Sequence, residues 1–176
     1  MRNLIVVAFL EPVTEGMEFP RDAWPLHITL VKFDVVEPPP AADGDGDVSA
    51  AAGDALAARV AGLMEAPARA ALGSAVTVGG EAGFGRGGSV PVSLIEPSAP
   101  LQTLHEALVA AVEALHGRIA TPGYTMAGFR PHVSHRGEKT PRAGEQLALD
   151  RIALVDMAPD GGHATRRVLR LWEATS

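Results

Sequence analysis

The order of apolar and polar positions predicts a chain of short strands with two helices among them. Residues 4–10 form an unbroken apolar run rich in Val and Ile, and this run is too short for a helix, so it predicts a buried strand. The segment 11–25 contains Pro and Gly and predicts a loop. Further apolar runs between turn residues predict strands at 27–36, 74–79, 89–96, 148–157 and 166–172, and one more within 124–136.

Two segments repeat apolar residues at helical spacing. The first begins at Asp47 or Ser49, is rich in alanine and extends to about residue 64. The second covers residues 98–117, opens with Ser-x-Pro, carries a leucine stripe and ends at a glycine. Because strands and helices do not alternate with a βα period, the pattern favours an α+β fold over a doubly wound parallel sheet.

Two connections contain residues that suggest ligand sites, and both are better explained as loops. The glycine-rich residues 79–88 lead into a strand rather than a helix and lack the Lys-Ser/Thr of a phosphate loop, so they predict a turn. In the acidic connection after residue 37, Val48 stands where a calcium loop needs glycine, which favours a solvated loop. Four aspartates there have EF-hand-like spacing: Asp43, Asp45, Asp47 and Asp54.

Length and composition limit the class of protein. The chain of 176 residues is long enough for a single domain with its own core, and its net charge of −6 gives no general attraction to a nucleic-acid backbone. The absence of cysteine excludes disulfides, thiolate nucleophiles and Cys-type zinc sites. No run approaches the roughly 20 apolar residues of a membrane span, and the first strand lacks a cleavage pattern. A cytoplasmic monomer is therefore expected.

The candidate chemistry lies in two similar segments, residues 24–30 and 129–136. In each, a proline precedes a histidine by one or two positions, and an apolar residue and then Thr or Ser follow. On a strand, side chains alternate between faces, so His27 lies with Thr29 and His132 lies with Ser134. Two such strands would line a polar groove with the imidazoles and hydroxyls needed for acid-base chemistry on a phosphate.

The same alternation sorts the neighbouring residues. Arg130 and Arg136 are expected on the face of His132, with Arg136 the first choice as a phosphate partner, whereas His135 is expected to face away. Lys32 is expected on the far side of its strand or at the open end. Two aromatic residues suit base stacking and core packing equally well, Phe129 and Phe33.

The two segments, His27-Ile-Thr29 and His132-Val-Ser134, resemble the paired motifs of the two-histidine (2H) phosphoesterase superfamily, in particular the bacterial 2′-5′ RNA ligase and 2′,3′-cyclic phosphodiesterase group. The order of elements is similar too. The resemblance implies a bilobal α+β fold, in which two antiparallel β-sheets face each other across a central groove with helices packed on the outside. Residues 1–176 would form one domain of two pseudo-symmetric lobes, each contributing one motif.

The resemblance also implies a function. His27 and His132 would act as general base and general acid, Thr29 and Ser134 would bind phosphate oxygens, and neither metal nor cofactor would be required. The expected substrate is a 2′,3′-cyclic phosphate or 2′-5′ linkage on a nucleotide or RNA end, with reversible ligation as a further activity. Family members often carry a basic residue five places after the histidine; Lys32 fits this, whereas Arg136 stands at four places.

Two alternatives remain open at this point. A zinc site would need three convergent ligands, and His132 and His135 cannot chelate together from one straight strand. A binding module would hold a nucleotide or cyclic phosphate without turnover. The intact histidines and hydroxyls of both motifs favour an enzyme, and an assay separates the two.

Overall fold

The computed structural model describes residues 1–36 and 48–175, so the acidic connection with three of the four candidate calcium ligands, Asp43, Asp45 and Asp47, lies outside the described residues, whereas Asp54 falls within a helix. Short 3₁₀ turns occur at Arg86–Gly88 (η1), Pro122–Tyr124 (η2), Met126–Gly128 (η3) and Pro159–Gly161 (η4). Along the chain, the helices and strands are β1 (Arg2–Phe9), β2 (Glu18–Pro20), β3 (His27–Val35), α1 (Val48–Ala71), β4 (Ala75–Phe84), β5 (Val90–Ile95), α2 (Ala99–Ala114), β6 (His132–Ser134), β7 (Gln146–Ala148), β8 (Arg151–Asp156) and β9 (Thr165–Glu173).

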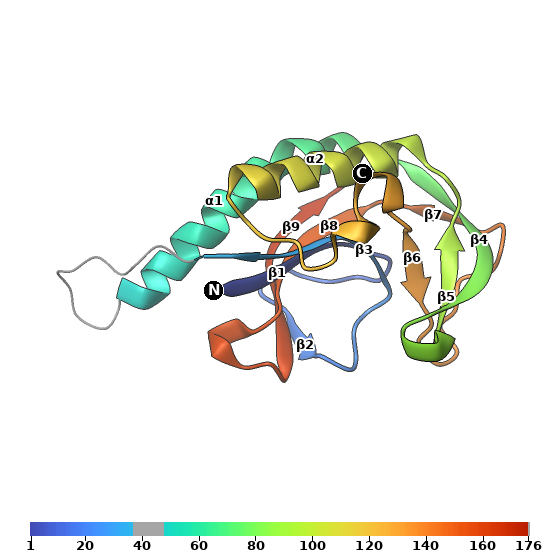
Figure 1. Ribbon diagram of the computed structural model, residues 1–176, viewed down its shortest axis with the longest axis horizontal. Coiled ribbons are helices and arrows are strands. Elements are labelled where there is room, and N and C mark those ends of the chain that lie inside the picture. The colour runs from blue at the N-terminus through green and yellow to red at the C-terminus, as the bar shows by residue number, and fades with distance from the viewer. Residues whose placement is uncertain (37–47, 176) are drawn as a thin grey trace.

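The strands of the described residues form one nine-stranded antiparallel sheet in the order β2-β9-β8-β1-β3-β6-β5-β4-β7. Figure 1 shows this sheet curled, with α1 and α2 side by side on its outer face. The predicted α+β class, with antiparallel strands and helices on the outside, is confirmed. Among the described residues, neither helix is long and apolar enough to cross a membrane.

The strand β1 is buried on both faces, which explains its unbroken apolar sequence. Leu4, Val6 and Ala8 belong to the main core, between the sheet and the helices. On the other face, alternate residues join a smaller core closed by Phe19 and Trp24; the β1 residues of that core are Ile5, Val7 and Phe9. This smaller core fills the inner face beneath β1, β8 and β9.

A β-bulge in β3 changes the face of every residue that follows it. Val6 pairs with Val31 but Val7 pairs with Thr29, so Leu30 is an extra residue on β3. Lys32 therefore pairs with Ile5, on the same face as Thr29, and the expectation that Lys32 lies on the far side is wrong. Phe33 lies on the helix-covered face, where it is 1% exposed, so of its two expected roles the structure agrees with core packing and not with base stacking.

Two strands were not anticipated, and both are three residues long. β2 lies within the predicted loop 11–25 and pairs with β9, while β7 pairs with β4. Such short segments carry no periodicity of their own, because the partner strand supplies their hydrogen bonds. The glycine-rich turn is present but shorter than predicted: β4 extends to Phe84, so residues 79–84 are strand and the turn covers 85–89. A Cβ on Gly83 would approach the carbonyl oxygen of Gly88 to 2.6 Å, which explains the glycine there.

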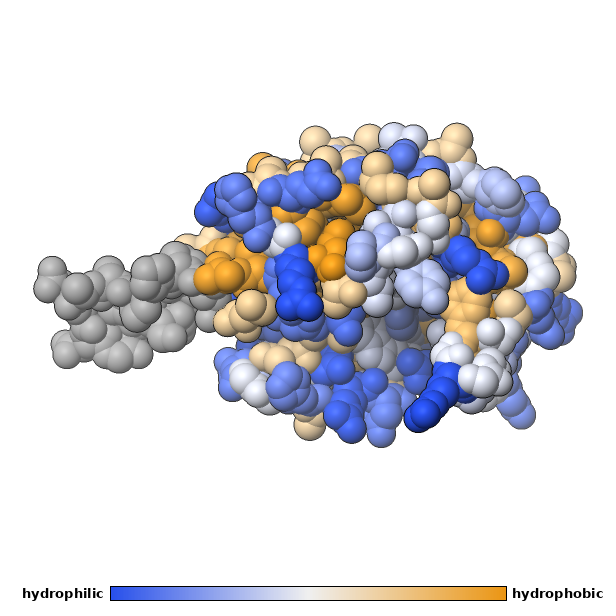
Figure 2. Space-filling model, in the orientation of Figure 1, coloured by the Kyte–Doolittle hydropathy of each residue, from blue (hydrophilic) through white to orange (hydrophobic). Residues whose placement is uncertain are grey.

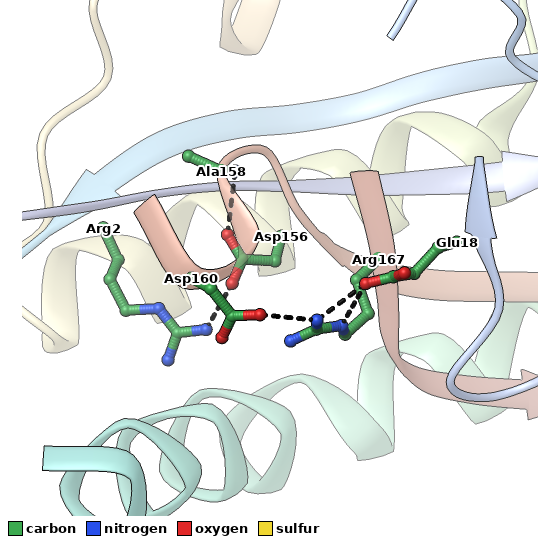
Figure 3. A network of polar contacts seen from close by, with 6 residues as sticks. All are labelled: Arg2, Glu18, Asp156, Ala158, Asp160 and Arg167. Atoms are coloured by element: carbon green, nitrogen blue, oxygen red, sulfur yellow. Dashed lines mark hydrogen bonds and ion pairs between the residues drawn. The ribbon is translucent and has the colours of Figure 1, made fainter. Parts of the chain in front are cut away.

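Ion pairs join β2 to β9 and to the neighbouring turn η4 at the edge of the sheet (Figure 3). Arg167 of β9 pairs with Glu18 of β2 at 2.6 Å and with Asp160 of η4 at 2.9 Å. Both carboxylates raise the pKa of the Arg167 guanidinium, and Arg167 in turn lowers the pKa of Asp160. Arg2 pairs with the buried Asp156 at 2.6 Å, so the start of β1 and the end of β8 are joined as well.

Candidate active site

The two histidine motifs meet where β3 pairs with β6. This pairing divides the sheet into two halves, β2-β9-β8-β1-β3 and β6-β5-β4-β7. β3 pairs with β6 at Ile28 and Val133, and both of these side chains are fully buried in the main core. Antiparallel register then places His27 across from Ser134 and Thr29 across from His132, all on the opposite face. The structure thus brings together the four polar motif residues that the sequence indicated.

Both motif histidines are held in the same tautomer by the same local contact. Nδ1 of His27 lies 2.8 Å from the carbonyl oxygen of Pro25, and Nδ1 of His132 lies 2.8 Å from that of Arg130. A carbonyl oxygen only accepts hydrogen bonds, so each Nδ1 carries a proton and donates it. In the neutral ring Nε2 is then unprotonated, and it is the nitrogen available to take a proton from a substrate or water.

Burial keeps both imidazoles neutral near pH 7. It lowers the pKa of His27 to about 4, and the positive charges of Arg136 and His132 act in the same direction, against the Pro25 carbonyl. Burial also lowers the pKa of His132. The positive charge of the Arg130 guanidinium acts in the same direction, and the hydrogen bond to the Arg130 carbonyl oxygen acts against it. An anion between the two rings would raise both pKa values, because it favours the imidazolium form.

Aromatic side chains that the sequence did not single out enclose each histidine. The rings of Trp24 and His27 have centroids 4.6 Å apart, and Phe9 contacts His27 edge-on at 6.2 Å. On the other half, Phe84 lies edge-on to His132 at 4.4 Å. Trp24 stands inside the first motif segment, but the position of Phe84 follows from strand pairing and has no local sequence signal.

Four cationic side chains surround the site. The Arg130 guanidinium stacks over Phe84 at 4.9 Å, and Lys32 lies on the groove face of β3. Arg136 donates a hydrogen bond to the carbonyl of Asp22 at 3.3 Å, across the junction of the two halves. Lys139 crosses the same junction to form an ion pair with Glu11. Because Glu11 balances the charge of Lys139, the local positive charge comes from Lys32, Arg130 and Arg136, in a chain with net charge −6.

The carboxylate of Glu11 links the two halves. Its Oε1 accepts from Lys139 Nζ at 2.6 Å, and its Oε2 accepts from the Leu26 amide at 2.7 Å, one residue before His27. Both hydrogen bonds lower the pKa of Glu11. The start of β3 and the segment after β6 are thus tied to one carboxylate beside the site.

A cavity of about 460 Å³ opens beside Thr29 and His132, a size typical of small-molecule sites. Figure 2 shows this face of the molecule hollowed, with hydrophilic residues along the lower rim. Phe129, one of the two predicted stacking residues, borders the cavity. The lining combines cations with aromatic and polar groups and includes Lys32, Arg130, Phe84, Tyr124, Thr121 and Phe129.

His135 lies on the side of β6 away from the groove, as expected. Its Nε2 is 2.8 Å from the hydroxyl of Ser93, which is 1% exposed. This pair belongs to the support of β5 and β6. Among the described residues, no three His, Asp or Glu side chains come together in a way that would hold a metal ion.

Comparison with known proteins agrees with this geometry. The sequence model of the family described as the 2′-5′ RNA ligase superfamily matches residues 11–157, which include both motifs. A comparison with curated proteins gives no match.

Several solved structures share the fold. TT0787 of Thermus thermophilus is 20% identical over 97% of each chain, with a TM-score of 0.53. A phosphoesterase is 16% identical over 99% of each chain, with a TM-score of 0.55. E. coli LigT in complex with 3′-AMP is 15% identical over 99% of each chain, with a TM-score of 0.54. With the family match across both motifs and a fold shared over nearly the whole chain, the protein is an enzyme of the 2′-5′ RNA ligase superfamily, the two-histidine phosphoesterases.

Proposed function

We propose that the protein is a metal-independent phosphodiesterase that hydrolyses a 2′,3′-cyclic phosphate, or a related 2′-5′ linkage, on a nucleotide or RNA end. The observation that carries the proposal is that His27 and His132 are diagonal neighbours on the paired strands β3 and β6. Both have Nε2 unprotonated, and both have a hydroxyl residue beside them, Thr29 and Ser134. This is the arrangement that acid-base chemistry on one phosphate requires.

In hydrolysis, one imidazole takes a proton from water through Nε2 while the water oxygen bonds to phosphorus. The bond between phosphorus and one ribose oxygen breaks, and the other ring, as imidazolium, gives its proton to that oxygen. The product is a phosphomonoester beside a free hydroxyl, and the two rings have exchanged protonation states. Each proton transfer contributes about 10²–10⁴-fold. In ligation, a ribose hydroxyl would take the place of water.

Hydroxyl and cationic groups would stabilise the phosphate oxygens during this step. Thr29 and Ser134 would donate to the non-bridging oxygens, and Arg136, Arg130 and Lys32 would balance the developing negative charge. Two of these cations, Arg136 and Arg130, also help to keep the histidines neutral. A bound phosphodiester anion would offset them and allow one ring to become the imidazolium acid.

The cavity beside His132 would receive the nucleoside. Its aromatic groups suit a base, and Phe129 and Tyr124 are the candidates for stacking. The 3′-AMP bound to LigT supports a nucleotide as the ligand class. The local cations would attract a small anionic substrate or a short RNA end in spite of the negative net charge.

The test is hydrolysis of a panel of 2′,3′-cyclic mononucleotides and 2′-5′ dinucleotides in EDTA, with the phosphate isomer of each product identified. We expect turnover in EDTA and a loss of about 10²–10⁴-fold in both His27→Ala and His132→Ala. The exposed His163→Ala is the matched control and should keep full activity.

Full activity in both His27→Ala and His132→Ala would contradict the proposal. Loss of activity in EDTA with recovery in zinc would show metal-dependent hydrolysis instead. Tight binding of unaltered ligand by the wild-type protein would identify a binding module.

A further inference from the structure

One wall of the cavity is a loop rather than a strand. Residues 121–129, which contain η2 and η3, contribute Thr121, Tyr124, Thr125 and Phe129 to the lining. Within this loop Met126 has φ of 57°, in the left-handed region that non-glycine residues adopt at a cost. Hydrogen bonds within the loop offset part of this cost, among them the Phe129 amide to the Met126 carbonyl oxygen at 3.2 Å, and further contacts come from outside the loop.

Two side chains of α2 supply those contacts. Gln102 Nε2 donates to the Met126 carbonyl oxygen at 2.7 Å, and the Met126 amide donates to His105 Nε2 at 2.9 Å. Gln102 and His105 are three positions apart, so they lie on the same face of the helix. Both backbone polar groups of the strained residue are thus bound by neighbouring side chains.

The second ring nitrogen of His105 reaches the bulge. Nδ1 donates to the carbonyl oxygen of Leu30 at 2.7 Å, and Leu30 is the extra residue that turns Lys32 to the groove face. The His105 ring also stacks on Phe129, with centroids 3.9 Å apart and planes 3° apart. One imidazole therefore contacts the bulge, the loop and an aromatic residue of the cavity.

His105 cannot take part in the chemistry itself. Its side chain is 1% exposed, and both ring nitrogens are already engaged by backbone groups. Donor and acceptor roles are fixed, because Leu30 presents a carbonyl and Met126 presents an amide. A purely cationic or an apolar side chain at this position would leave one or both of these groups without a partner.

We propose that His105 is a positioning residue that holds the bulge at Leu30 and the 121–129 loop in a fixed relation. Lys32, which follows the bulge, and the loop can then bind the phosphate and the nucleoside of one substrate at the same time. This rests on the proposed function of the site. Gln102 contacts the Met126 carbonyl of the loop and not the bulge, so it is expected to position the loop alone.

A double-mutant cycle with Lys32 tests the bulge part of the proposal. His105→Leu should raise KM about 10-fold with kcat within about threefold of wild type, because Lys32 and the loop lose their support. His105→Gln offers both a donor and an acceptor and should restore KM to within about threefold. In a Lys32→Met background, His105→Leu should raise KM by less than about threefold, since much of the effect of His105 on KM acts through Lys32.

A full 10-fold effect in both backgrounds would overturn the proposal, because a general packing role gives additive changes. His27→Ala is measured alongside. Wild-type turnover that does not depend on His27 would overturn the proposed function, whereas normal turnover with additive His105 effects overturns only the positioning role.

Gln102→Leu provides a second test at a partly exposed site, where folding is not at risk. We expect KM for a 2′,3′-cyclic mononucleotide to rise about threefold, and KM for a cyclic phosphate without a base to stay unchanged. Thr103→Ala, on the exposed side of α2, is the matched control. Equal effects of Gln102→Leu on both substrates, or no effect on either, would contradict the role of the loop.

Discussion

Lys32 and Thr29 lie on the same face of β3 although three positions separate them, because Leu30 is an extra residue between them. Lys32 is thereby among the residues that line the cavity beside His132. We expect Lys32→Met to raise KM about 10-fold, through the loss of a charge-assisted contact to phosphate. The dependence of KM on salt concentration should also weaken.

Arg59→Met, on the exposed side of α1, is the control for the loss of one positive charge. Steady-state kinetics between low and moderate salt measure both variants. If KM and its salt dependence changed equally in Lys32→Met and Arg59→Met, Lys32 would act through the net charge of the protein and not at the site.

The pH profile follows from the two lowered pKa values. Catalysis needs one imidazole neutral and one protonated, so kcat/KM should be bell-shaped, with an acid limb near pH 4 from His27 and an alkaline limb below 6.5 from His132. The profile of kcat should lie at higher pH, because the bound phosphate anion raises both pKa values. Identical profiles for kcat and kcat/KM would contradict this electrostatic account.

Arg136 lowers the pKa of His27 through its positive charge. Arg136→Met should therefore raise that pKa and move the acid limb of kcat/KM to higher pH. The exposed Arg142→Met should leave the limb where it is. A titration of the His27 ring by NMR, without substrate, measures the shift directly.

His27 also makes the stability of the protein depend on pH. Its pKa falls from the model-peptide value of 6.5 to about 4 on folding, so between these values the unfolded chain binds the proton more readily. The contribution of His27 to the free energy of unfolding is fully present above pH 6.5. It decreases by about 3 kcal/mol as pH falls towards 4. Urea unfolding at pH 7, 6 and 5 measures the decrease, and His27→Gln should make it smaller while His163→Ala should not.

Glu11 and Lys139 form one ion pair but are expected to differ in their effects. Lys139 is 65% exposed, so Lys139→Met should cost less than about 1 kcal/mol of stability. Glu11 is 26% exposed and also accepts the Leu26 amide, so Glu11→Ala should cost about 1–3 kcal/mol and lower kcat by disturbing the start of β3. Equal costs for the two variants would show that the amide contact contributes little.

The parts of the site that sequence reasoning found are those encoded locally. Each histidine lies two positions from its hydroxyl residue, and alternation along a strand is sufficient to place the two on one face. Lys32 was misplaced because strict alternation was assumed through Leu30, whereas the bulge there is set by pairing with β1. Phe84 was missed because its contact with His132 depends on how β4, β5 and β6 pair.

The burial of Ile28 and Val133 has a consequence for the size of the reacting group. These two residues fix the register of β3 and β6, and so make His27 and His132 diagonal neighbours on adjacent strands. The Cα atoms of diagonal neighbours in an antiparallel pair are about 7–8 Å apart, so two imidazoles that start from these positions on one face can reach one tetrahedral phosphate from two sides. The spacing of the two histidines therefore depends on two aliphatic side chains that belong to the core on the opposite face of the sheet.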